Sequence, residues 1–118
     1  MYKFKFDTSK ISWTKKTVTN NSITELSIKA SDDNYYNNVF LPLLKNLVNI
    51  EFKFVVVEKE ADNKHTWIID TLRLVGFDMV NDKIRSGANR DNVYIEGIVR
   101  EHLINSNIGA YEFYLIYK

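Results

Sequence analysis

The architecture depends most on residues 55–80, which read Val55-Val-Val-Glu-Lys-Glu-Ala-Asp-Asn-Lys-His-Thr-Trp-Ile-Ile-Asp-Thr-Leu-Arg-Leu-Val-Gly-Phe-Asp-Met-Val80. The apolar start is typical of a buried strand, and the charged residues after it indicate a loop. Apolar residues then recur at helical spacing, which predicts a helix with one buried face. The residues expected to form that buried stripe are Ile68, Ile69, Leu72 and Val75.

The two ends of this expected helix also have sequence signals. Asp62 or Asn63 can cap its beginning. Gly76 follows its last turn, where a residue in the left-handed conformation often ends a helix, and only glycine adopts that conformation at little cost. A new strand is expected to open at Phe77.

The rest of the chain supplies further strands and helices. The run at 50–57 becomes continuously apolar, which predicts a central strand covered on both faces. A helix is expected over 39–48, with Pro42 near its first turn and Asn49 after its end, and a third helix over 91–103. The other expected strands are 2–6, 11–18, 23–28, 77–80 and 111–117. The order βββαβαβ(α)β predicts an α/β (α+β) fold, with one mixed sheet flanked by two or three helices.

The composition fits one domain over residues 1–118. With 16 basic and 15 acidic residues the net charge is +1, which gives no global reason to expect binding to nucleic acid. The lysines that alternate with aromatic residues in the first strands are explained by ordinary binary patterning. There is no cysteine, and no apolar run approaches the length of a membrane span. We therefore expect a cytoplasmic location and no membrane partner.

Catalytic chemistry has little support in the sequence. His65 and His102 are far apart, and neither has a partner at metal-ligand spacing. No serine lies in a Gly-x-Ser-x-Gly motif. Glu58, Glu60 and Asp62 cluster after a central strand, where they could supply a general base or contact a polyamine. We favour a solvated loop for this cluster, and we expect no enzyme activity, no cofactor and no metal.

Several elements together resemble the folded C-terminal domain of ornithine decarboxylase antizyme, which has an acetyltransferase-like (GNAT) fold without the coenzyme A loop. The family pattern is an aliphatic strand, a charged loop, a helix ending in Gly-Phe, an acidic residue and an aliphatic strand. Residues 55–80 follow this pattern. The Trp13-containing strand, the polar turn after it and the aliphatic strand at 23–28 are also similar to the hairpin that precedes the first helix of antizymes.

The resemblance implies a non-catalytic regulator that binds the ornithine decarboxylase monomer, inhibits it and promotes its proteasomal degradation in polyamine homeostasis. By position in the family, partner contacts would come from the charged loop, the second helix and aromatic anchors of the first helix. The residues implied are Tyr35, Tyr36, Lys59, Glu60, Lys64, Asp70 and Arg73.

Two alternatives remain open. One is a small inhibitor, viral or phage for example, that uses the same scaffold on another protein target. The other is a divergent N-acetyltransferase. That reaction requires a glycine-rich loop to hold the pyrophosphate of acetyl coenzyme A, and residues 58–65 contain no glycine.

Overall fold

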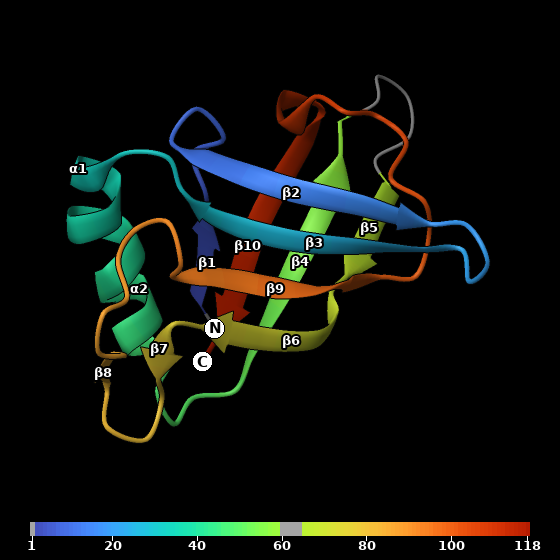
Figure 1. Cartoon of the computed structure of the whole chain (residues 1–118). Helices are drawn as coiled ribbons and strands as arrows, with labels where there is room; N and C mark the ends of the chain where they lie inside the picture. Colours follow the sequence, from blue (N-terminus) through green and yellow to red (C-terminus); the bar gives the residue numbers. More distant parts are fainter. Residues whose placement is uncertain (1, 60–64) are drawn as a thin grey trace.

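The chain forms two four-stranded antiparallel sheets that pack face to face (Figure 1). The computed structural model describes residues 2–59 and 65–118. Sheet A has the strand order β1 (Tyr2–Lys5), β10 (Tyr111–Tyr117), β4 (Phe52–Glu58) and β5 (His65–Ile68). Sheet B has the order β2 (Ile11–Val18), β3 (Ile23–Ala30), β9 (Tyr94–Val99) and β6 (Asp70–Val75).

The strands of sheet B cross those of sheet A, as in orthogonal packing of two sheets (Figure 1). Aromatic rings fill the space between them: Phe6 stacks on Phe54 with ring centres 5.7 Å apart, and Trp13 meets Phe113 edge to face at 5.8 Å. Eight inward residues near the centre of the two sheets are at most 4% exposed. From sheet A these are Phe54, Val56, Phe113 and Leu115, and from sheet B Leu26, Ile28, Ile95 and Val99.

The two sheets are joined at a sharp corner at Ile69. β5 is an edge strand of sheet A, and β6, which begins one residue later, is an edge strand of sheet B. The N–H group of Ile69 donates to the carbonyl of Phe54 at 2.9 Å, and its side chain is buried. Just after the corner, Thr71 has φ of +53° and the pairing with β9 shifts register, which is the signature of a β-bulge.

One continuous helical segment lies at an end of the sandwich (Figure 1). It comprises α1 (Asp33–Tyr35), the π-helical turn η1 (Tyr36–Phe40) and α2 (Leu41–Asn46). The segment starts earlier than expected, so Pro42 lies within it rather than near its first turn. The wide turn, in which the N–H of Leu41 donates to the carbonyl of Tyr36, immediately precedes Pro42 and relieves the clash that proline makes with the preceding turn.

The remaining elements are short. β7 (Phe77–Asp78) and β8 (Lys83–Ile84) form a two-stranded hairpin, and the 3₁₀ turn η2 (Ile108–Ala110) leads into β10. Gly76 has φ of +77°, as expected for its position, but it joins β6 to β7 instead of ending a helix.

The expected second and third helices are wrong. Residues 65–75 form β5, the corner and β6, and residues 94–99 form β9. The bend at Ile69 and the bulge beside Thr71 interrupt the alternation of a strand, so the apolar residues mimic helical spacing. In the expected third helix, Ile98 is apolar although it points outward between the inward residues Gly97 and Val99. This extra apolar residue also makes the spacing resemble that of a helix. The mixed α+β class is confirmed, with one helical segment and antiparallel sheets in place of a single flanked sheet.

Candidate functional site

The outward face of sheet B carries two arginine–carboxylate pairs, together with half-buried apolar residues such as Val75 and Ile98. One row across its four strands consists of Thr14, Ser27, Glu96 and Arg73. Arg73 donates from Nε to Glu96 Oε1 at 2.6 Å, and Arg100 donates to Asp70 at 2.9 Å. Such a face is typical of the solvated side of a sandwich.

The outward face of sheet A has a different character. The register places Lys5, Tyr114, Val55 and Ile68 in one row across all four strands. Ile68 is 54% exposed, and Tyr114 is half-buried. Val55 is only 7% exposed although it lies outside the core cluster, because its own neighbours on the outward face shelter it. The centre of this face is therefore apolar.

Rows on either side extend this surface. Lys3, Ile116 and Lys53 form the row on one side, and Glu112, Val57 and Thr66 form the row on the other. We call these ten outward positions the A face. Its members are Lys3, Lys5, Lys53, Val55, Val57, Thr66, Ile68, Glu112, Tyr114 and Ile116.

The charge on the A face is positive, with three lysines and one carboxylate. Glu112 pairs with Lys5 at 2.6 Å, and this hydrogen bond, together with the charge of Glu112, raises the pKa of Lys5. Lys3 lies 4.2 Å from the ring centre of Tyr114, a cation–π contact. Burial raises the pKa of the Tyr114 hydroxyl, and the charge of Glu112 raises it further. Lys5 therefore stays charged, and Tyr114 neutral, at neutral pH.

One end of the A face opens into a hollow of about 540 Å³. Lys53 and Ile116 belong to both. Phe52 lines this hollow and also a groove of about 650 Å³ beside β6 and the β7–β8 hairpin. The other residues of the hollow are Glu51, Tyr117 and Lys118.

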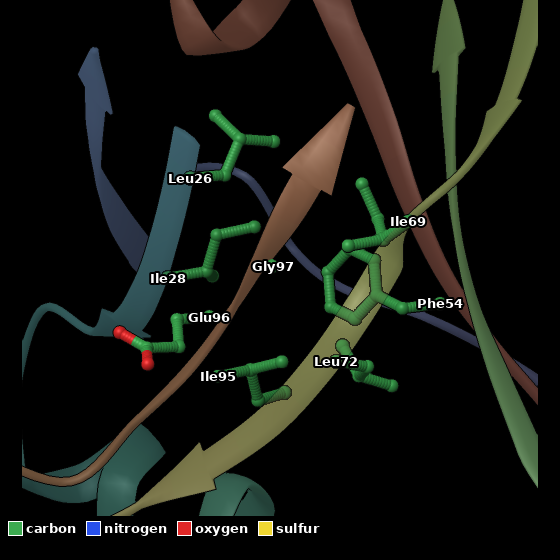
Figure 2. Close-up of a pocket in the computed structure, with 8 residues that line it drawn as sticks. All are labelled: Leu26, Ile28, Phe54, Ile69, Leu72, Ile95, Glu96 and Gly97. Atoms are coloured by element: carbon green, nitrogen blue, oxygen red, sulfur yellow. The ribbon is translucent and has the colours of Figure 1, made fainter. Parts of the chain in front are cut away.

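A much smaller cavity lies between the two sheets. Its volume is about 10 Å³. Figure 2 shows that it lies beside Gly97, where the side chains of Phe54, Ile69 and Leu72 gather between the sheets. That volume is close to the minimum for a single water molecule, and apolar side chains dominate the lining.

The residues implied by the antizyme resemblance do not form one surface. Tyr35 and Tyr36 are 9% and 6% exposed and belong to the core, so they are not available as surface anchors. Asp70 and Arg73 are exposed on the outward side of sheet B, where both form ion pairs. Lys59 is exposed after β4, and its N–H donates to the carbonyl of Ala110 at 2.9 Å. Glu60 and Lys64 lie outside the described residues.

Both histidines have structural contacts. His65 lies 4.0 Å from Glu101, whose carboxylate accepts the indole N–H of Trp67 at 2.8 Å. A ring nitrogen of His102 lies 3.1 Å from the carbonyl oxygen of Val18. Within residues 2–59 and 65–118, no group of three or more acidic or histidine side chains is placed to hold a metal ion.

Sequence reasoning missed the A face, although its signal was present. The apolar run of β4 predicted a strand covered on both faces; Phe54, Val55 and Val56 are indeed buried, but the described residues place no helix or second sheet over the outward face. Val55 and Val57 are therefore apolar at positions where a one-sided sandwich would carry polar residues.

Comparison with known proteins gave no matching family model, no matching curated sequence and no matching solved structure. Across the described part of the chain, no helix is long and apolar enough to cross a membrane. The function must therefore be argued from the surface itself.

Proposed function

We propose that this chain is a non-catalytic domain that binds another protein through the A face. The observation that carries the proposal is the exposed Ile68 beside the half-buried Val57 and Tyr114 on the outward side of sheet A. Contiguous apolar surface of this kind, bordered by charged residues, marks interaction sites in proteins.

The contrast between the two sheets supports a specific role for the A face. Both sheets belong to the same sandwich and have the same number of strands, yet sheet B carries paired opposite charges on its outward face. Polar residues at Val57 and Ile68 would be compatible with the fold, because both side chains point away from the core and water reaches them. A binding partner gives these apolar residues a function.

Ornithine decarboxylase is the first partner to test, because of the sequence resemblance to antizyme. In that form of the proposal the chain acts in the cytoplasm, inhibits the decarboxylase monomer and directs it to the proteasome. Lys59, Asp70 and Arg73 are exposed and can contact a partner. However, the helix that shaped the resemblance is a pair of strands, so the support for this partner is limited to sequence spacing. An inhibitor of another protein is the broader form of the same proposal.

The test compares two matched substitutions at exposed outward positions of edge strands: Ile68→Asp on β5 and Thr14→Asp on β2. Cross-linking of the wild-type chain in cells identifies candidate partners. The wild-type chain and both variants are then titrated by calorimetry against each purified candidate and, separately, against ornithine decarboxylase. We expect Ile68→Asp to weaken binding at least tenfold, because it puts a charge in place of the most exposed large apolar side chain of the A face, and Thr14→Asp to leave binding unchanged. Equal binding by both variants would refute the proposal.

The decarboxylase itself has a separate readout. Stoichiometric loss of its activity, with conversion of the homodimer to a one-to-one heterodimer, would establish the antizyme form of the proposal. Unchanged activity and dimer at micromolar concentrations of this chain would remove ornithine decarboxylase as the partner.

A further inference from the structure

We infer that the A face binds an amphipathic helix of its partner, with acidic residues on the side of its apolar stripe that faces the row of Lys3, Ile116 and Lys53. This inference rests on the proposed function of the same face. It adds the shape and the charge of the partner, each of which follows from a different observation.

The shape follows from the open side of the sheet. An apolar sheet face is normally buried against helices or a second sheet, and the helical segment of this chain lies at the end of the sandwich instead (Figure 1). A row across four strands spans roughly 14 Å at ~4.8 Å between strands. About ten helical residues, at 1.5 Å each, cover that length. A helix is also about 10 Å wide, enough to contact all three rows.

Addition of a partner strand at the edge of sheet A is less favourable. β1 has only four residues, and Lys3 and Lys5 project from it, a combination that discourages edge pairing. β5, at the other edge, also has only four residues before the chain turns into the corner at Ile69. The apolar surface lies on the face of the sheet and not along these edges.

The charge follows from the lysines. Lys3 and Lys5 lie at one end of the central apolar residues, and Lys53 lies between the strands that carry Ile116 and Ile68. Glu112, the one carboxylate of the A face, is paired with Lys5. Aspartate or glutamate beside the apolar stripe of a partner helix would pair with Lys3 and Lys53, and such complementarity sets specificity and the rate of association.

The hollow beside the A face supplies an anchor point. It adjoins Lys53 and Ile116, and with about 540 Å³ it can accept a large apolar side chain of the partner. Binding energy at interfaces concentrates in anchors of this kind. The hollow lies beyond the row of Lys3, Ile116 and Lys53, at the ends of the central strands β4 and β10, so a helix that crosses the four strands would direct a side chain from its middle into it.

The test uses two synthetic peptides of about 20 residues with the same leucine stripe, one with glutamate and one with lysine on its polar face. Each is titrated into the full ¹⁵N-labelled chain and followed by NMR. We expect only the glutamate peptide to bind, with shift changes at Lys53, Ile68 and Tyr114 and with weaker binding at higher salt. The double variant Lys3→Glu with Lys53→Glu should weaken this binding at least tenfold and favour the lysine peptide.

Three results would overturn the inference: equal binding of both peptides, binding of neither, or shift changes outside the A face. Vesicles containing phosphatidylserine provide a further arm, because a basic and apolar surface can also contact an anionic membrane. If the chain bound these vesicles through its lysines but did not bind the glutamate peptide, the ligand of the A face would be a lipid surface and not a partner helix. Failure of the glutamate peptide while Ile68→Asp still abolishes binding of the natural partner would refute the helix and leave the proposed function standing.

Discussion

The hydroxyl of Tyr35 accepts a hydrogen bond from the N–H of Asp7 at 3.2 Å, whereas the hydroxyl of its neighbour Tyr36 is buried and has no partner among the described residues. Both side chains belong to the core, and burial raises the pKa of both hydroxyls. A buried polar group without a partner loses its hydration and gains nothing in return. The hydroxyl groups of these two adjacent tyrosines therefore have opposite effects on the free energy of unfolding.

Removal of each hydroxyl tests this difference. Tyr36→Phe should raise the free energy of unfolding by about 1 kcal/mol, because it eliminates an unsatisfied donor. Tyr35→Phe should lower it by a similar ~1 kcal/mol, because the N–H of Asp7 loses its acceptor. Urea denaturation of both variants measures these changes. Destabilisation by Tyr36→Phe would show that its hydroxyl is hydrogen-bonded after all.

Two glycines with nearly equal backbone angles should differ in their tolerance of alanine. Gly76 has φ of +77° and Gly87 has φ of +80°. A Cβ atom at Gly87 would meet nothing within 4 Å, whereas at Gly76 it would overlap the carbonyl oxygen of Asn92. We expect Gly87→Ala to cost about 1 kcal/mol through the left-handed conformation alone, and Gly76→Ala to cost at least twice as much. Equal losses in thermal or urea unfolding would mean that the backbone at Asn92 yields easily.

The sequence signal at Gly76 was interpreted correctly in chemical terms, but the elements on either side of it were not. A positive φ was expected at Gly76 and is present, yet the elements on both sides are strands. The spacing of Ile68, Ile69, Leu72 and Val75 fits a helix only because a corner and a bulge interrupt two strands. The β-branched and aromatic residues between Thr66 and Val75 favour strands, in conflict with the helical spacing of the apolar residues. A corner between two sheets depends on tertiary packing, which no local pattern specifies.

The A face illustrates a second limit of sequence reasoning. The apolar run of β4 correctly predicted a central strand. Whether both faces of that strand are covered depends on where the other elements pack, and the helical segment packs at the end of the sandwich. The surface is also assembled from four strands that are distant in sequence, so its residues could not be grouped before the register was known.

The cap of the helical segment predicts a pH dependence. The side chain of Asp32 accepts the N–H of Tyr35 at 2.8 Å, and this bond lowers the pKa of the carboxyl from 3.8, with a smaller contribution from the charge of Lys10. The stabilisation is therefore fully present above the ordinary pKa and is lost as the pH falls through the lower pKa of the folded chain.

The substitution Asp32→Asn isolates this effect, because asparagine is an equally good cap without a titratable charge. At pH 7 the wild-type chain should be the more stable of the two in thermal unfolding, and the difference should vanish near pH 2. Other carboxyl groups are common to both proteins and cancel in the comparison. A difference that stays constant between pH 7 and pH 2 would contradict the assigned role of the Asp32 charge.

Stability measurements also test whether the A face is open in the isolated chain. Phe54 lies on the inward side of β4 and is 1% exposed, whereas Ile68, on the neighbouring strand, points outward and is 54% exposed. Phe54→Ala should lower the free energy of unfolding by about 3–5 kcal/mol through a cavity between the sheets. Ile68→Ala should change it by less than about 1 kcal/mol, because water already reaches most of that side chain. A large loss for Ile68→Ala, especially one that increases with protein concentration, would show that the A face is already buried, for example between two copies of the chain. A small loss leaves Ile68 free to contribute its apolar surface to binding, which is the condition that the proposed function requires.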